Sequence, residues 1–349
     1  MNLGNMLLRN VTPRNPRRAR SLTLGALAGT VALALTGCTT GDDNVVRVYS
    51  ARHYDLEQAF EKFNEDTGIK VEFLFGSDAE LREKIEAEGE DTQADVYMTV
   101  DAGNLANAAD QGIFAPLQSD VLDQAVPEGL RDPQDRWFGL AQRARTIVYS
   151  PERVDPSELS TYEDLADPRW DGRLCLRQST ATYTQSLVAS MIAADGDEAT
   201  EEVVQGWADN AEIFNNDVEI IDNIASGKCD VGIVNHYYLA RELNDNPDLP
   251  VKLFWANQDT TGVHVNISGA GVTANADDPE LAQQLLEWLA TDGQEEFVSD
   301  NFEFPVNPDV APVPLIADFG PFTAQDVDAA AYGELNGAAV ELMARAGYK

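Results

Sequence analysis

The first part of the chain alternates short apolar runs with segments in which apolar residues recur at helical spacing. Residues 45–50, "VVRVYS", form an apolar run typical of a buried strand. Residues 55–68 then place apolar side chains on one helical face and end at Gly68, a common helix terminator. The alternation continues with strand and helix patterns at residues 71–75, 78–89, 94–100 and 102–112. This order predicts a parallel sheet with helical crossovers.

Two extended runs near the middle of the chain interrupt this order. Residues 137–141 and 146–149 are β-like and are separated by the basic sequence "QRAR". A second set of strands and helices is predicted beyond them, at residues 173–177, 184–196, 200–214, 220–227 and 229–235. Residues 262–273 are β-like and lead back toward the first set, and residues 279–301 predict a helical pair. We therefore expect two α/β lobes joined by crossing strands, with a ligand cleft near the carboxyl ends of the strands.

The N-terminal residues read as an export signal and not as part of the fold. Five arginines precede an uncharged stretch at residues 21–36, which at 16 residues is short for a membrane span. The stretch ends in "LTGC", which matches a bacterial lipobox. We expect residues 1–37 to be a lipoprotein signal peptide, Cys38 to be lipidated, and residues 38–44 to be a tether. The alternative is an ordinary N-terminal anchor helix with a chance cysteine.

The net charge of −36 narrows the range of partners. Removal of residues 1–37 would leave 19 basic and 60 acidic residues, a charge of −41. Such a surface repels nucleic acid and anionic lipid head groups, so we expect no nucleic-acid partner and membrane contact through the lipid anchor alone. The acidity would concentrate cations, although solubility explains it equally well.

Two cysteines remain once Cys38 is assigned to the lipid. Cys175 and Cys229 each lie at a β-like run, so neighbouring strands could bring them within bridging distance in an oxidising compartment. Two buried free thiols are an equal alternative. Metal binding by this pair is disfavoured, because no CxxC or Cys/His spacing accompanies it.

Phenols gather at predicted strand-to-helix turns. His53 and Tyr54 follow the first strand, Tyr183 follows the strand of Cys175, and Tyr237 and Tyr238 follow the strand of Cys229. Oxygen donors select hard cations, and displacing phenolic protons requires a strongly acidic ion such as Fe(III). Calcium or magnesium would favour carboxylates and carbonyls. Taken alone, each tyrosine could instead be an ordinary half-buried side chain at a strand end, with no ligand role.

Two histidines are expected to play no part in the site. His236 precedes the tyrosine pair and should point elsewhere if both phenols face the cleft. His264 lies in a β-like run and is expected to be packed or hydrogen-bonded.

Arg143 and Arg145 alternate on a predicted strand and so face the same side. They would either hold a carbonate-like anion or offset surplus phenolate charge, or else form a surface salt bridge. The sequence contains no GxSxG, P-loop, HExxH or GxGxxG signature, so no nucleophile is nominated and we expect no enzymatic activity.

At these residues the chain resembles the ferric-ion-binding substrate-binding proteins of bacterial ABC iron importers, in the tyrosine-rich branch of solute-binding protein family 1. The resemblance covers essentially the whole mature chain and is carried by several blocks in family order, among them "VYSARHYDLEQAFEKFNEDTGIKV", "ADVYMTVDAGNL", "GLAQRARTIVYS", "CDVGIVNHYYLARELN" and "NFEFPVNPDV". It implies a type II periplasmic-binding-protein-like fold, with an N-terminal lobe at 45–143 and 266–312 and a C-terminal lobe at 144–265 and 313–349.

The resemblance also implies the site and the partners. Its metal ligands fall on His53, Tyr54, Tyr183, Tyr237 and Tyr238, with Fe(III) as the transported ligand. Val100 and Asp101 stand where another branch has a glutamate ligand, a departure that favours the tyrosine-rich branch and leaves Asp101 outside the implied ligand set. Cys175 and Cys229 match positions that look disulfide-paired.

We therefore expect an extracytoplasmic, monomeric lipoprotein that delivers Fe(III) to an ABC permease with its cytoplasmic ATPase. The alternative is a receptor of the same fold for thiamine, a polyamine, a phosphonate or an oxyanion. A synergistic carbonate-like anion at Arg143 and Arg145 is a further expectation.

Overall fold

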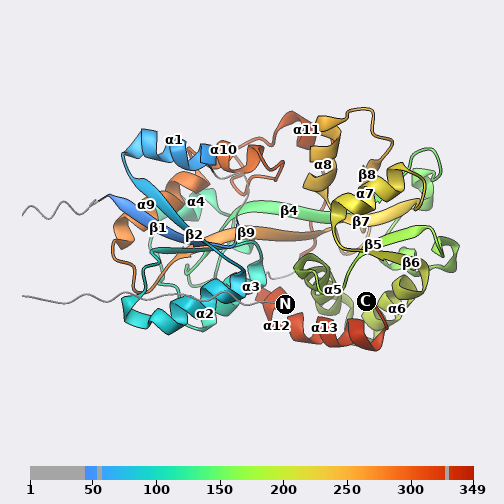
Figure 1. The fold of residues 1–349 in the computed structure, drawn as a ribbon, viewed down its shortest axis with the longest axis horizontal. Coiled ribbons are helices and arrows are strands. Elements are labelled where there is room, and N and C mark those ends of the chain that lie inside the picture. Colours follow the sequence, from blue (N-terminus) through green and yellow to red (C-terminus); the bar gives the residue numbers. More distant parts are fainter. Residues whose placement is uncertain (1–43, 53–56, 327–329) are drawn as a thin grey trace, which may run out of the picture. The chain divides into compact units, whose positions relative to one another are not determined.

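The computed structural model describes residues 44–52, 57–326 and 330–349 (Figure 1). The predicted signal peptide, Cys38, His53 and Tyr54 lie outside these residues. Among the described residues, none of the helices has the length and apolar character that a membrane span requires.

The first α/β unit has the predicted parallel order. Its elements are β1 (Val45–Ser50), α1 (Glu57–Thr67), β2 (Lys70–Phe75), α2 (Asp78–Glu88), β3 (Val96–Thr99) and α3 (Ala102–Asp110). β1 pairs in parallel with both β2 and β3, so the three carboxyl ends meet at one edge. The sequence prediction for this region is confirmed.

A single long strand crosses between the two halves of the molecule. β4 (Phe138–Tyr149) spans both runs that the sequence suggested were separate. It pairs antiparallel with β9 (His264–Val272), with a register shift between Gly139 and Ala141. The two expected runs are parts of this one strand, because residues 142–145 between them keep their ladder pairing with β9, and the expected strand position of Arg143 and Arg145 is confirmed.

The second unit follows β4. It contains β5 (Leu174–Arg177), α5 (Thr182–Asp195), α6 (Asp197–Asn210), β6 (Ala211–Phe214), α7 (Asp217–Ala225), β7 (Val231–Asn235), α8 (His236–Asp245) and β8 (Lys252–Phe254). Residues 200–214 were expected to be one helix, but α6 ends at Asn210 and the last four residues form β6. The sequence "AEIF" instead pairs in parallel with β5, where it extends the sheet.

The remaining elements are short connections or lie after β9. They are α4 (Asp120–Ala125), α9 (Pro279–Ala290), α10 (Gln294–Ser299), α11 (Pro314–Ala317), α12 (Ala330–Glu334) and α13 (Asn336–Arg345), with 3-10 turns at η1 (Gly89–Asp91), η2 (Glu128–Leu130), η3 (Pro156–Glu158), η4 (Glu163–Ala166) and η5 (Pro168–Trp170). The predicted helical pair at 279–301 is confirmed as α9 and α10.

In the described chain one sheet of nine strands runs in the order β2-β1-β3-β9-β4-β7-β5-β6, with β8 paired to β4. Helices cover both of its faces, with α1, α9 and α10 opposite α2 and α3 at one end and α7 and α8 opposite α5, α6 and α13 at the other (Figure 1). The buried apolar residues divide along β4. Those up to Ala141 pack in what we call the first-lobe core and those from Ala144 pack in the second-lobe core. The fold is the expected two-lobed α/β architecture.

A disulfide joins Cys175 on β5 to Cys229, two residues before β7, with their Cα atoms 5.9 Å apart. β5 and β7 are parallel neighbours, and this places the two cysteines together. The bridge closes a segment with a sequence separation of 54, for which chain entropy gives about 4 kcal/mol of stabilisation. The disulfide expectation is confirmed.

Candidate functional site

Two neighbouring strands of the second lobe deliver the tyrosines to one place. Tyr183 lies in the first turn of α5, just after β5, and Tyr237 and Tyr238 lie in the first turn of α8, just after β7. Because β5 and β7 are parallel neighbours, their carboxyl ends lie side by side. The phenols therefore converge although 54 residues separate Tyr183 from Tyr237.

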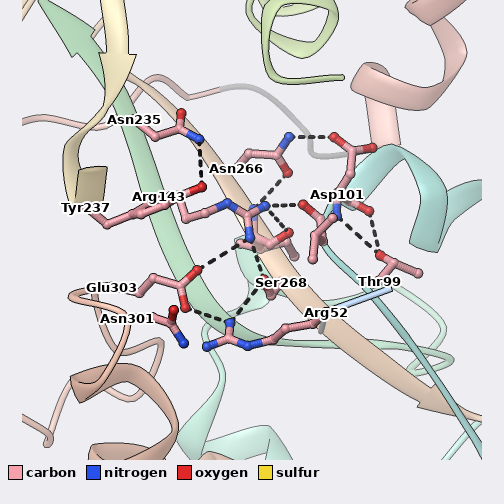
Figure 2. A network of polar contacts seen from close by, with 12 residues as sticks. Arg52, Thr99, Asp101, Arg143, Asn235, Tyr237, Asn266, Ser268, Asn301 and Glu303 are labelled. Carbon is pink, nitrogen blue, oxygen red and sulfur yellow. Dashed lines mark hydrogen bonds and ion pairs between the residues drawn. The ribbon is translucent and has the colours of Figure 1, made fainter. Parts of the chain in front are cut away.

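The phenol oxygens lie close together. Tyr237 Oη lies 3.4 Å from Tyr183 Oη. Asn235 Nδ2 also donates to Tyr237 Oη at 3.4 Å, as Figure 2 shows. The rings of Tyr237 and Tyr238 have centroids 4.4 Å apart. Oxygen ligands bind metal ions at about 2.0–2.2 Å, so one ion could contact both Tyr183 and Tyr237 with little movement.

Guanidinium groups surround the phenol rings. Arg143 and Arg177 lie 5.7 and 5.2 Å from the centroid of Tyr183. Arg241 lies 5.1 Å from the centroid of Tyr237 and 5.9 Å from that of Tyr238. Positive charge at this distance favours the phenolate form of a tyrosine. The sequence analysis missed Arg177 and Arg241, although Arg177 ends the strand before Tyr183 and Arg241 lies one helical turn beyond Tyr237.

The Tyr183 hydroxyl is protonated at neutral pH in the protein without a ligand. Its side chain is half-buried, and desolvation raises the pKa of Tyr183 above its ordinary value, while Arg143 acts in the opposite direction. A cation that binds here must therefore displace a proton.

His236 and His264 are both buried, and the His236 ring stands edge-on to the Tyr237 ring, with centroids 5.9 Å apart. The His236 ring packs 4.6 Å from Phe304, and its Nδ1 lies 3.2 Å from the amide nitrogen of Ala144. His264 packs against Tyr332, with centroids 5.0 Å apart. Burial lowers the pKa of each imidazole to about 3, so both stay neutral near pH 7.

Arg143 and Arg145 form ion pairs in the interior and not at the surface. Arg143 shares Glu303 with Arg52, at 3.6 and 2.6 Å (Figure 2). Arg145 shares Asp217 with Arg177, at 3.0 and 3.6 Å. The alternative of a surface salt bridge was therefore wrong, because these ion pairs are buried. Each group of two arginines and one carboxylate has a formal surplus of one positive charge, and an anion at Arg143 and Arg145 stays a prediction.

Asp101 is engaged by protein partners. It begins α3 as its N-cap, accepting from the amide of Asn104 at 3.1 Å, and its other oxygen accepts from Ser186 and Asn266 at 2.7 and 2.6 Å. These bonds occupy both carboxylate oxygens.

The first-lobe ligands stay predictions, because His53 and Tyr54 fall beyond the described residues. Where the structure describes the chain, no group of three or more His, Cys, Asp or Glu side chains could hold a metal ion. The donors that the described residues bring together are thus the phenols of Tyr183, Tyr237 and Tyr238.

The fold and this cluster define a two-lobed extracytoplasmic-type binding protein, and comparison with known proteins identifies its family. The family model for bacterial extracellular solute-binding proteins matches residues 50–296. The chain belongs to this family.

Several relatives are named for iron uptake or iron binding. "Iron uptake protein A1" of Synechocystis sp. is 40% identical over 324 residues, covering 89% of each chain. The "Fe(3+)-binding periplasmic protein" of Serratia marcescens is 30% identical, covering 92% of this chain and 96% of its own. The Trichodesmium protein IdiA, or FutA, solved with iron and citrate ligands, is 41% identical, with a TM-score of 0.82 over 87% of this chain and 100% of its own.

Proposed function

We propose that this protein captures Fe(III) between its lobes and delivers it to a membrane permease for iron uptake. The observation that carries the proposal is the convergence of Tyr183, Tyr237 and Tyr238, with Oη atoms of the first two 3.4 Å apart. Relatives named for iron uptake or Fe(3+) binding, at 30–40% identity over nearly the whole chain, support it.

The second lobe would supply these three phenols, and the first lobe would supply His53 and Tyr54. Fe(III) is acidic enough to displace phenolic protons, as metals do with bound thiols and water. The guanidinium groups of Arg143, Arg177 and Arg241 would stabilise the phenolates that form. The raised pKa of Tyr183 means that binding releases a proton, so affinity should weaken as the pH falls.

The formal surplus of positive charge in the two arginine–carboxylate groups could be balanced by phenolates or by a bound carbonate-like anion. Part of the charge of Arg143 and Arg145 is compensated by Glu303 and Asp217. The remainder would offset negative charge from several phenolates. A carbonate-like anion would add to this balance and is proposed as an optional partner of the ferric ion.

The rest of the proposal concerns the cellular setting. Solute-binding proteins of this family serve ABC transporters, and we propose a monomer that presents its closed form to a permease coupled to a cytoplasmic ATPase. The lobes would comprise residues 45–143 with 266–312 and residues 144–265 with 313–349, hinged at β4 and β9. We propose that lipid on Cys38 anchors the protein outside the cytoplasmic membrane, and that it catalyses no reaction.

Addition of ferric citrate to metal-stripped protein tests the function. Ferric phenolates absorb visible light by charge transfer, so the protein should become coloured and retain about one iron per chain after desalting. Replacing both Tyr237 and Tyr238 by Phe should remove colour and iron, whereas a ligand that only stacks on the rings would still bind. Wild-type protein that stays colourless and iron-free would contradict the proposal.

A further inference from the structure

The carboxylate of Asp101 joins three parts of the fold. Asp101 caps α3 in the first lobe, Asn266 lies on the crossing strand β9, and Ser186 lies on α5 in the second lobe. One oxygen of Asp101 accepts from both Ser186 Oγ and Asn266 Nδ2, at 2.7 and 2.6 Å. Figure 2 shows Asp101 beside Asn266 and close to Arg143.

The bond between Asp101 and Ser186 lies in the interior. Asp101 is 5% exposed and Ser186 is 2% exposed. Hydrogen bonds to an ionised acceptor are roughly twice as strong as neutral ones, and their loss inside a protein leaves the carboxylate oxygen partly unsatisfied. A serine hydroxyl on α5 is thus tied firmly to the first lobe.

A second set of contacts joins α3 and β9 to α12 beside Asp101. The backbones of α3 and α12 approach so closely that a Cβ atom on Gly103 would lie 2.5 Å from the nitrogen of Gly333. The hydroxyl of Tyr332 on α12 donates to the carbonyl of Val265 on β9 at 3.0 Å. The next helix, α13, packs in the second-lobe core, so the chain spans both lobes beside Asp101.

Ser186 shares a helix face with Tyr183. Residues three apart lie on the same side of an α-helix, so a bond that holds Ser186 also fixes the orientation of the Tyr183 side of α5. Asn266 is paired across the ladder with Arg143, whose guanidinium lies over the Tyr183 ring. Asp101 is therefore connected to Tyr183 in two ways: through Ser186 on the same helix, α5, and through Asn266 on β9, which pairs with Arg143.

We propose that Asp101 is a positioning residue for the phenol site. Its carboxylate holds the Ser186 face of α5 against the first lobe and keeps Tyr183 beside Tyr237. The proposal rests on the proposed function in taking Tyr183 as a ferric ligand, and it gives Asp101 a role other than metal binding.

The test compares Ser186→Ala with Ser190→Ala. Ser190 is also buried on α5, but its hydroxyl donates to the carbonyl of Leu187 within the same helix. Loss of a hydrogen bond to a charged group should make Ser186→Ala release iron about tenfold faster than the wild type, with a shifted charge-transfer band. Ser190→Ala should match the wild type in both measurements.

An iron-free measurement separates this proposal from the ferric function. In metal-stripped protein, hydrogen exchange at the first turns of α3 and α5 should be faster in Ser186→Ala than in Ser190→Ala. Equal exchange in the two variants would overturn the positioning role, whether or not iron binds. Wild-type protein that binds no iron would overturn the ferric function alone.

The variant Asp101→Asn covers the case in which Ser186→Ala fails to fold. Asparagine is as good an N-cap as aspartate, so α3 keeps its cap while the charge that holds Ser186 is removed. Faster exchange at the start of α5 would support the proposal, and exchange equal to that of the wild type would overturn it.

Discussion

The two lobes hold charged groups of the same kind in different surroundings. In the first lobe Glu303 lies between Arg52 and Arg143, and in the second lobe Asp217 lies between Arg145 and Arg177. The second lobe adds three phenols directly beside its arginines, whereas the first lobe adds the Asp101 contacts. The comparison teaches that the second lobe brings its three phenols together within its own fold, whereas the described part of the first lobe contributes buried charges and the Asp101 contacts that we propose position them.

The largest expected effect comes from removing the second-lobe donors. The variant Tyr183→Phe/Tyr237→Phe/Tyr238→Phe should lose ferric binding by at least about 100-fold, because no phenolate remains in this cluster to replace the lost bonds. Competition with a chelator of known affinity measures the change. Tyr49→Phe in the first lobe is the matched control, since its hydroxyl contacts Glu88 far along the chain from these turns. A triple variant that binds like this control would refute the donor set.

Neutralising the carboxylate that two arginines share should destabilise the protein more in the second lobe, at Asp217, than in the first lobe, at Glu303. Asp217→Asn leaves Arg145 and Arg177 without their shared anion and also weakens the bond from the Asn235 amide. Losing one partner of a buried ion pair costs about 3–5 kcal/mol, measured by urea unfolding.

Glu303→Gln should cost less within that same range, because Glu303 pairs with Arg52 and Arg143, whereas Asp217 pairs with two arginines and also accepts from the Asn235 amide. Asp197→Asn, in an exposed pair with Arg345, is the control and should change stability by less than about 1 kcal/mol. A larger loss in Glu303→Gln than in Asp217→Asn would reverse the comparison.

The disulfide stabilises one lobe. Replacing Cys175 and Cys229 together by Ser should lower the free energy of unfolding by about 2–4 kcal/mol, because the unfolded chain regains the freedom of the closed loop. Hydrogen exchange should accelerate in β5 and β7 while β1 and β3 change little. Equal acceleration in both lobes would show that the bridge stabilises the whole molecule as one unit.

Acid should weaken the fold through its buried histidines, and this is the smallest effect. His236 and His264 have a pKa of about 3 in the folded protein, below their ordinary value of 6.5. The folded state then binds fewer protons than the unfolded state, so stability is full above pH 6.5 and falls as the pH drops.

Between pH 7 and pH 5 the loss should be on the order of 1–2 kcal/mol per histidine. Urea unfolding of His236→Gln should show a shallower pH dependence than the wild type. An unchanged dependence would mean that His236 is charged in the folded state.

Local pattern was sufficient to predict most of the fold. The alternation of apolar runs and helical stretches predicted the parallel pairing that β1 makes with β2 and β3, and the two cysteines were expected on neighbouring strands, where the structure places them. The sequence pattern failed where pairing with a strand distant in the sequence decides whether a segment is helix or strand. Residues 211–214 continue a helical pattern and become β6 because β5 offers a free edge.

The convergence of the three phenols was predictable from the sequence, whereas the charged and polar residues packed around them were not. Phenols after strands are visible in a single sequence, since strand ends are where open sheets bind ligands. Glu303 and Asn266 lie 160 and 123 residues beyond Arg143, and nothing local marks them as its neighbours. The contact between Asp101 and Ser186 spans 85 residues and depends on how the lobes pack, so no spacing rule could indicate it.

Anomalous X-ray diffraction at the iron absorption edge, from crystals grown with Fe(III), tests the proposed site most directly. The three-phenol site predicts one strong peak within bonding distance of the hydroxyl oxygens of Tyr183, Tyr237 and Tyr238. Absence of a peak there, or a peak held by other residues, would contradict it.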